Sequence, residues 1–393
     1  MRPESTEVDL LIVAPQVVCP STGLDGPGSI GVTDGLISFV GVDVPSTLLP
    51  RARRVLKLGD GVLMPGLVDL HTHPAVEGSR FGVDPDTRLL PRGSTTVLSQ
   101  GDAGARNFDE YRRHTIEASR TRVKLAINLC ASGESNPLGR FYNLDEASVE
   151  ECVAAVERGG GHIWGISVNI AHIRGSDVHP LDVLRKGIIA AEQAYRPVMF
   201  GATKNSVVSL RDQLKLLRPG DVMTYCFHSG DGSIVQGGRV LDCVWEARER
   251  GVLFDVGDGT AAFGFDVAEQ AIGEGFLPDT ISTDFYRYHV TSREPHDLPR
   301  VVSKLIASGM TTQQCWPRIT SVPAGVLGLG NEAGSIRPGV QADLTLLRIG
   351  TKSGSLRDGR GEVRLGLVWE PVATFRSGQL VQPVILTVPD AQS

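Results

Sequence analysis

The chain has 393 residues, of which 41% are hydrophobic and 21% are charged, as is usual for a globular protein with a large core. Its net charge is -6 and it contains no block of basic residues, so we do not expect a nucleic acid as a partner. No apolar run is long enough to cross a bilayer, so we expect no association with a membrane.

The first part of the chain has the pattern of short β-strands separated by turn residues. Residues 8–60 contain the runs "VDLLIVAPQVV", "SIGVTDGLISFVG" and "ARRVLKLG", at hairpin-like spacing. The last part has the same pattern, in the runs "ADLTLLRI", "VRLGLVWE" and "PVATFRSGQLV". We therefore expect residues 1–64 and 333–393 to form one small β-sandwich domain together.

The cysteines and the N-terminal segment bear on the cellular compartment. Six cysteines are scattered along the chain without a CxxC pair, which favours free thiols and argues against a cysteine-based zinc site. The N-terminal apolar run follows acidic residues and lacks the basic segment of a secretion signal. We expect a cytoplasmic protein.

The stretch "LMPGLVDLHTHPAV", Leu63–Val76, places two histidines directly after an apolar run. Because side chains alternate along a β-strand, Asp69, His71 and His73 would share one face of the strand. Two imidazoles on one face, at the end of a strand, can hold one divalent metal ion. A pair of hydrogen-bonded core histidines is the alternative interpretation.

Between the two ends of the chain, apolar strand-like runs alternate with helical patterns. Counting "GLVDLHTH" first, the strand candidates continue with "STTVLSQG", "RVKLAINLC", "HIWGISVNI", "RPVMFGATK", "DVMTYCFHS", "GVLFDVGDG" and "DTISTDFY". Helical patterns between them include "NFDEYRRHTIEASR", "ASVEECVAAVERG" and "LDVLRKGIIAAEQAY". Eight such units predict an α/β fold, a (β/α)8 barrel over residues 65–332, with its active site at the carboxyl ends of the strands.

The eighth strand candidate ends in "TISTD", which places Asp284 at a strand end. The eighth strand lies beside the first in a closed barrel, so we expect Asp284 next to His71 and His73. Two imidazoles and one carboxylate leave an open position for water on a catalytic zinc ion. The ion lowers the pKa of that water, and a carboxylate can take its proton.

Further motifs extend this pattern over nearly the whole chain. They are "MPGLVDLHTH", "GSTTVLSQGDAGARNFDEYRRHTIEASRTRV", "VMTYCFHSGDGSIV", "VLFDVGDGTAAFGFDVAE", "PDTISTDF", "DLPRVVSKLIASGM" and "AGVLGLGNEAGSIRPGVQADLTLL". Together they resemble the amidohydrolase superfamily, and within it the dihydroorotase-like bacterial deacetylases. The resemblance implies a metal-dependent hydrolase that cleaves an amide or a related C–N or ester bond with an activated water.

The sequence departs from that branch at the metal site. Ser167 stands where the branch has a carboxylated lysine that bridges two metals, and Gly201 stands where its fifth strand has a histidine. Three further histidine positions are occupied by Tyr225, Asp258 and Tyr286. Because serine cannot be carbamylated and glycine offers no ligand, the two-metal centre cannot be assembled. The two strand-one histidines and the strand-eight aspartate remain, so we expect one Zn²⁺ per chain.

Three residues are candidates for catalytic roles. Asp284 would accept a proton from the activated water besides binding the metal. Asp258 is the alternative base, or binds a cationic group of the substrate, or only caps a loop. Tyr225 would line the pocket or polarise the substrate carbonyl, and simple packing explains it equally well.

Three other residues are candidates for the substrate pocket, namely Ser167, His228 and Tyr286. His228 is three residues beyond Tyr225 and would face the other side of a regular strand, so a structural role is favoured over ligation. Lys204 is an alternative bridging lysine, although a lysine in a solvated loop is the simpler interpretation.

The reduced site leaves two classes of function open. The first is a mononuclear zinc hydrolase acting on a small molecule or a peptide. Its substrate could belong to a natural-product pathway, for example follower-peptide removal as in bottromycin-type peptides, where one amidohydrolase acts. The second is a catalytically inactive barrel that binds a ligand or a protein. A two-metal deacetylase is disfavoured by Ser167 and Gly201, and a homo-oligomer is compatible with the sequence.

Overall fold

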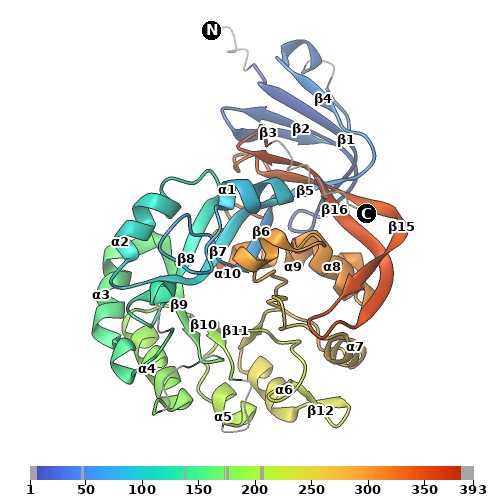
Figure 1. The fold of residues 1–393 in the computed structure, drawn as a ribbon. Helices are drawn as coiled ribbons and strands as arrows, with labels where there is room; N and C mark the ends of the chain where they lie inside the picture. Colours follow the sequence, from blue (N-terminus) through green and yellow to red (C-terminus); the bar gives the residue numbers. More distant parts are fainter. Residues whose placement is uncertain are drawn as a thin grey trace, which may run out of the picture.

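The computed structural model describes residues 7–45, 48–136, 139–171, 173, 177–203 and 208–381. The chain forms a barrel-like body with a separate β-sheet beside it (Figure 1). Strands from both ends of the chain lie together in the separate sheet, where the blue and red parts of the ribbon meet. Lys204 lies outside the described residues.

The sheet beside the barrel has eight strands, in the order β17-β16-β15-β5-β1-β2-β3, with β4 paired to β1. Its strands are β1 (Leu10–Cys19), β2 (Leu24–Thr33), β3 (Leu36–Gly41), β4 (Val55–Lys57), β5 (Val62–Pro65), β15 (Leu344–Arg357), β16 (Val363–Arg376) and β17 (Gln379–Val381). The antiparallel pairing of β5 with β15 joins the two ends of the chain. Buried side chains such as Ile12, Ile30 and Phe375 give this sheet a core of its own.

The last strands differ from the sequence-based expectation. The runs "VRLGLVWE" and "PVATFRSGQLV" do not form two separate strands, because β16 continues through Pro371 and only its end turns back as β17. The register between β15 and β16 shifts next to this proline, where Leu346 faces Ala373 and Leu347 faces Pro371. Such a bulge accommodates a residue that has no N–H to donate.

The barrel sheet has the order β14-β11-β10-β9-β8-β7-β6, and its neighbouring strands are parallel. Its strands are β6 (Leu67–Thr72), β7 (Ser94–Gly104), β8 (Arg122–Asn128), β9 (Ile163–Asn169), β10 (Val198–Gly201), β11 (Val222–Thr224) and β14 (Leu253–Phe254). A small hairpin, β12 (Val235–Gln236) with β13 (Arg239–Val240), follows β11.

Helices surround the strands on the outside of the barrel (Figure 1). They are α1 (Pro85–Arg88), α2 (Phe108–Tyr111), α3 (Val149–Gly159), α4 (Pro180–Gln193), α5 (Leu210–Leu214), α6 (Asp242–Glu249), α7 (Phe265–Gly273), α8 (Leu298–Ala307), α9 (Thr312–Arg318) and α10 (Ser321–Val326).

The eighth barrel position is filled by an irregular segment where the sequence predicted a strand. Thr280 bridges to Asp255 after β14, and Phe285 bridges to Thr72 of β6, both in parallel. This segment therefore closes the ring between the last and the first strand. Its residue Asp284 has a φ of 49°, in the left-handed region, which interrupts the extended backbone that a regular strand needs.

Helix α8 illustrates how the helices form and pack. The Asp297 carboxylate caps its first turn by accepting from the backbone N–H three residues later. Val301, Val302 and Leu305 recur at helical spacing and are buried against the core. Lys304 is buried on the same helix, so its charge must be paired inside the protein.

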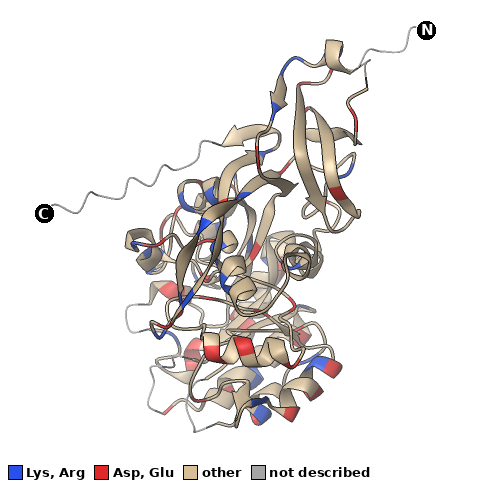
Figure 2. Cartoon of the chain, turned by 90° about the vertical axis from the view of Figure 1, so that its right-hand side faces the viewer, with Lys and Arg blue, Asp and Glu red and all other residues tan. Residues whose placement is uncertain are grey.

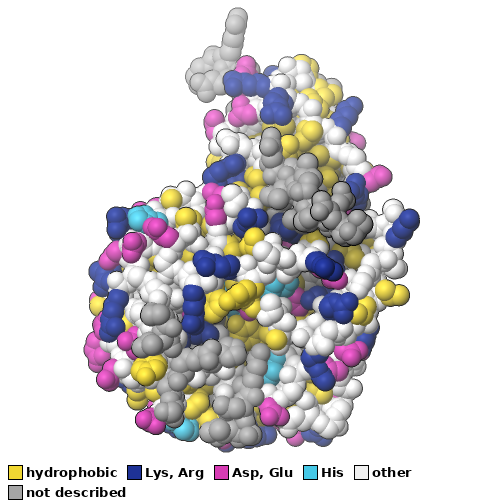
Figure 3. Space-filling model, in the orientation of Figure 1, with side chains coloured by type: hydrophobic (Ala, Val, Ile, Leu, Met, Phe, Trp, Pro, Cys, Tyr) yellow, Lys and Arg dark blue, Asp and Glu magenta, His cyan; other side chains and the backbone are white. Residues whose placement is uncertain are grey.

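The surface carries charges of both signs. Lysine and arginine positions are interspersed with aspartate and glutamate positions along the outer helices and loops (Figure 2). The space-filling view likewise shows basic and acidic groups scattered among polar and apolar ones (Figure 3). All six cysteines are buried and free of disulfides, as expected for free thiols. Within the described residues, we find no helix with the length and apolar character of a membrane span.

Candidate metal centre

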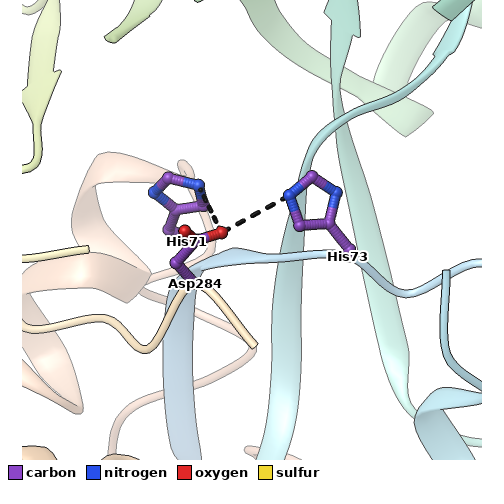
Figure 4. A group of neighbouring side chains, drawn as sticks. All are labelled: His71, His73 and Asp284. Carbon is purple, nitrogen blue, oxygen red and sulfur yellow. Dashed lines mark ion pairs between the residues drawn. The ribbon is translucent and has the colours of Figure 1, made fainter. Parts of the chain in front are cut away.

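The predicted ligands His71, His73 and Asp284 lie together at the carboxyl ends of the barrel strands (Figure 4). His71 is on β6, His73 directly follows it, and Asp284 comes from the irregular eighth segment. Asp284 Oδ1 lies 3.2 Å from His71 Nε2 and 3.4 Å from His73 Nε2. The Asp284 N–H donates to the His71 carbonyl at 2.7 Å, which holds the carboxylate beside the imidazoles.

The second nitrogen of His71 is fixed by a buried chain of hydrogen bonds. His71 Nδ1 lies 2.8 Å from Thr224 Oγ1, and the Thr224 hydroxyl donates to Asp255 at 2.8 Å. A hydroxyl has one proton to donate, so Thr224 accepts from His71 and Nδ1 carries the hydrogen. Asp255 also accepts from the hydroxyls of Thr280 and Ser282. In the neutral ring, the lone pair is therefore at Nε2, which faces Asp284.

The second nitrogen of His73 is fixed by a carboxylate. His73 Nδ1 lies 3.0 Å from Asp102 Oδ1. Asp102 also accepts from the hydroxyls of Ser79 and Ser99, each at 2.6 Å. A carboxylate that holds one nitrogen of an imidazole orients the ring and raises its basicity at the other nitrogen. The neutral His73 ring thus also presents its Nε2 lone pair to Asp284.

These contacts make the cluster a site for a cation. Asp284 Oδ1 is buried, and no group among the described residues donates a hydrogen bond to it. Lone pairs that face each other at 3.2–3.4 Å repel unless a proton or a metal ion lies between them. Burial opposes charge on His73, yet Asp102 and Asp284 raise its pKa to about 10. Burial alone would raise the pKa of Asp284, but His71 and His73 lower it well below its usual range.

Two nitrogen donors and one carboxylate, with a fourth side open to a pocket, are the donor set of a catalytic zinc site. The residues present therefore fit a divalent metal ion. The nitrogen that would bind it is the same in both histidines, since each Nδ1 is already engaged.

Two glycines let the backbone pass close to the ligands. Gly257 and Gly259 both have a φ of 53°. A Cβ on Gly257 would lie 2.4 Å from Thr224 Oγ1, and a Cβ on Gly259 would lie 2.7 Å from Asp284 Oδ2. Since real Cβ atoms do not approach that closely, the loop after β14 needs glycine at both positions.

The ligand cluster opens into a pocket of about 140 Å³. The pocket is lined by His73, Phe81, Arg140, Asn169, Tyr225, Asp284 and Tyr286. Rings form one wall, in which Phe81 packs edge-on against Tyr286 at 5.7 Å and lies 5.4 Å from the His73 ring. Arg140 and Asn169 add polar groups to the lining.

Both tyrosines of the predicted site line this pocket. The Tyr225 hydroxyl lies 3.4 Å from His71 Nε2 and 3.4 Å from Asn169 Nδ2. Burial and the nearby Asp284 raise the pKa of Tyr225 well above its ordinary value, so the hydroxyl keeps its proton and can donate it in a hydrogen bond. The Tyr286 ring also lines the pocket, and its hydroxyl is already paired with the Thr260 hydroxyl at 2.6 Å.

Asp258 lies in different surroundings. Its carboxylate accepts two bonds from Lys304 Nζ, at 2.7 Å and 3.0 Å, and lies 3.5 Å from His296 Nδ1. It does not line the pocket at the ligands. The structure thus places the alternative base outside the ligand cluster, with its charge already paired.

Two further candidates also lie outside the cluster. Ser167 is buried on β9, and its hydroxyl has no hydrogen-bond partner among the described residues. His228 is buried in the loop after β11, where its ring nitrogens lie 3.2 Å from the Tyr225 carbonyl and 3.0 Å from the Asp231 carbonyl. Neither residue lines the pocket at the ligands.

Sequence reasoning missed the residues that hold the ligands in place. Asp102 lies near the carboxyl end of β7, in "SQGDAG", and a carboxylate at that end of the strand beside the histidine pair was the signal that could have identified it. Thr224 and Asp255 act on His71 from β11 and the end of β14, and no local motif marks them. Arg140 lies in a loop and has no sequence signal of its own.

No protein-family model matches the sequence. The chain is similar to a deacetylase from Agrobacterium fabrum, with 31% identity over 345 residues, which cover 86% of this chain and 82% of the relative. A deacetylase from Brucella anthropi is 32% identical over 316 residues, which cover 79% of this chain and 77% of the relative.

Solved structures show the same architecture. An adenine deaminase matches with a TM-score of 0.83 and 26% identity, over 95% of this chain and 99% of that one. A dihydroorotase matches with a TM-score of 0.82 and 26% identity, over 95% of this chain and 98% of that one. The predicted α/β fold class with a (β/α)8 barrel is confirmed, and the two chain ends, predicted as a small β-sandwich, form one separate sheet.

Proposed function

This chain belongs to the amidohydrolase superfamily, and from that premise we propose that it hydrolyses an amide or a related C–N bond with one bound zinc ion. The observation that carries the proposal is the convergence of three lone-pair atoms, His71 Nε2, His73 Nε2 and Asp284 Oδ1, at one buried point beside a pocket. Packing alone does not explain such a point, because the lone pairs repel unless a proton or a metal ion lies between them.

The bound ion and the residues of the site would have separate roles in hydrolysis. When bound, the ion supplies Lewis acidity, which lowers the pKa of a water molecule and polarises the scissile carbonyl. Asp284 lies where it can take the proton of the attacking water and later give it to the leaving nitrogen. Tyr225 retains its proton and can donate a hydrogen bond to the oxygen on which negative charge develops.

A single metal ion is proposed because the positions that would hold a second one offer no ligand. Ser167 stands where a bridging lysine is implied by the resemblance, and its hydroxyl cannot be carbamylated. Gly201 stands where a histidine is implied, and a Cβ there would lie 2.7 Å from Asn169 Oδ1. The side chain of Asn169 therefore fills the space that such a histidine needs.

For the substrate, we propose a small amide or a modified peptide, with follower-peptide removal as the natural-product step to test. The support is the aromatic lining, since Tyr225 and Tyr286 stand where the resemblance implies histidines and give the pocket apolar surface for the substrate. The alternative function is an inactive barrel that binds a ligand, and metal content separates the two.

The test is elemental analysis of protein purified without added metal, followed by amide hydrolysis before and after chelation and reloading with Zn²⁺. We expect about one metal ion per chain and activity that follows the metal content. Two ions per chain would contradict the mononuclear site. A protein that cannot be loaded at all would favour the inactive barrel.

A further inference from the structure

A buried arginine lines the reaction pocket, and its charge is only partly compensated. Arg140 is 5% exposed and its Nη1 lies 2.8 Å from Glu134 Oε1. Glu134 is itself buried, and its other oxygen accepts from Arg80 at 3.0 Å and 3.2 Å. Two guanidinium groups thus share one carboxylate.

The two arginines are not equivalent. The Arg80 side chain is 37% exposed and its guanidinium lies over the Phe81 ring, 4.7 Å from the centroid, so water can solvate its charge. Arg140 is enclosed, and its Nε is buried without a hydrogen-bond partner among the described residues. The two arginines and Glu134 together carry one excess positive charge. This excess charge is on Arg140, which lines the pocket.

A buried excess charge is costly unless an opposite charge pairs with it. The Asp284 carboxylate in the same pocket already faces two imidazoles, so it does not serve Arg140. A guanidinium presents a planar fork of N–H donors that matches a carboxylate. The missing group is thus an anion that enters the pocket with the substrate.

We propose that Arg140 binds a carboxylate of the substrate, so that the enzyme acts on amides that carry a carboxylate a few bonds from the scissile bond. This inference rests on the proposed function and names its substrate class. The pocket of about 140 Å³ is small compared with typical ligand sites of about 300–1,000 Å³, so the carboxylate and the amide lie close together. N-acyl amino acids and the C-terminal residues of peptides share this chemistry.

The reaction balances without any co-reactant besides water. Water adds its oxygen to the carbonyl carbon and the C–N bond breaks. The acyl part leaves as a carboxylate, and the nitrogen takes up the protons and leaves as an ammonium group. The carboxylate held by Arg140 is unchanged and leaves with its half of the substrate.

The experiment compares each acid with its neutral methylamide. The probes are a panel of N-acetyl amino acids and a panel of short peptides with a free C-terminus, each paired with its C-terminal methylamide. Hydrogen bonds to charged groups contribute about 1.5–3 kcal/mol, so the zinc-loaded enzyme should prefer the acids by about 10- to 100-fold in kcat/KM. The panel that is cleaved distinguishes the two sources of the carboxylate.

Arg140→Met should remove this preference by lowering kcat/KM for the acids and leaving it unchanged for the methylamides. Glu134 keeps Arg80 as its partner in this variant, so the fold should persist, and thermal melting and metal content check that it does. Arg106→Met is the matched control, because Arg106 is 51% exposed, pairs with Glu151 and does not line the pocket.

A binding measurement separates this inference from the proposed function. N-acetylglycine and its methylamide are titrated by calorimetry into Asp284→Asn protein, with and without Arg140→Met. Tighter binding of the acid that depends on Arg140 supports the inference even if no amide is ever hydrolysed. Equal turnover and equal binding of acid and methylamide would overturn it and leave the proposed hydrolase standing. So would a uniform loss on both probes in Arg140→Met, which indicates a structural role only.

Discussion

Two aspartates at neighbouring barrel positions, Asp258 and Asp284, are both buried but have opposite surroundings. Asp258 accepts two bonds from Lys304, so the protein supplies its counter-charge. Asp284 faces the Nε2 atoms of two histidines, and in the part of the chain that the structure describes nothing donates a hydrogen bond to its Oδ1. The contrast teaches that burial does not identify a functional carboxylate. A functional carboxylate is identified when the protein does not supply its counter-charge, so that a bound ligand must supply it.

The largest effect is expected when the imidazoles that face Asp284 are removed. His71→Ala and His73→Ala should each abolish metal binding and activity, because two ligands do not retain zinc against chelation. Both residues lie at strand ends outside the packed barrel layers, so the fold should survive. Elemental analysis and circular dichroism check this, with His228→Ala as a histidine outside the cluster. Near-normal turnover in either ligand variant would refute the site.

The second test removes the proton acceptor and keeps its shape. Asp284→Asn should lower kcat by about 100- to 10,000-fold, the usual contribution of a general base, and should reduce metal content much less. Asparagine retains a carbonyl oxygen that can touch the metal but cannot take a proton. Rates and metal content are measured on the same samples. Normal turnover of Asp284→Asn would show that Asp284 is not the base.

The third test addresses the other half of the comparison. Asp258→Asn leaves Lys304 buried without its counter-ion, and breaking a buried ion pair costs about 3–5 kcal/mol of stability. We therefore expect a large drop in the free energy of unfolding, measured with urea. The double variant Asp258→Asn/Lys304→Met should recover most of the loss because no unpaired charge remains. Unchanged stability of the single variant would show that the pair does not have this structural role.

The fourth test asks whether Asp102 orients the imidazole of His73. Asp102→Asn weakens the carboxylate bond to His73 Nδ1 without touching the metal position. Loss of such a partner reduces metal affinity by about 10- to 100-fold. Competition with a chelator gives the affinity. Asp109→Asn serves as a control, since Asp109 is an exposed carboxylate on α2 away from the cluster. An affinity equal to that of the unmodified protein would rule out this role for Asp102.

The smallest effect concerns the stacked histidines next to Asp258. His289 and His296 stack at 3.7 Å, and burial, with His296 as the next cause, lowers the pKa of His289 to about 3. Since this is below the value of about 6.5 in an unfolded chain, the unfolded state takes up protons first as the pH falls, and stability is lost. At pH 5.5 the loss is about 1 kcal/mol for His289 relative to pH 7.5.

His289→Phe should therefore flatten the decline of unfolding free energy between pH 7.5 and 5.5, measured with urea at several pH values. Above pH 7.5 the slopes of the two proteins should coincide, because neither state of this histidine takes up a proton there. An unchanged slope below pH 7 would contradict the lowered pKa.

The sequence predicted the barrel and the grouping of His71, His73 and Asp284 because both follow from local patterns. Alternating apolar runs and helices imply the barrel, and the HxH pair and "STD" lie at the ends of strands that meet when the barrel closes. The eighth strand was predicted as regular, but the left-handed backbone at Asp284 breaks it. That conformation is imposed by contacts with His71 from another strand, which a local pattern does not contain.

The supporting residues could not be predicted for a related reason. Thr224 and Asp255 reach His71 from distant parts of the chain, so their role depends on which strands lie side by side. The pairing of Lys304 with Asp258 depends equally on how α8 packs. Glu134 lies in a short 3-10 helix and Arg140 in a loop, and no periodicity in the sequence predicts that their side chains meet.

The pairing of β5 with β15 also constrains the order in which the chain can mature during synthesis. Nearly all of the barrel sequence is translated between these two strands, so β5 waits with an open edge until the ribosome has made β15. An unpaired strand edge is a template for association with other chains. A nascent chain that stops before β15 therefore exposes an unpaired, aggregation-prone edge of β5, directly beside β6, the strand that carries His71.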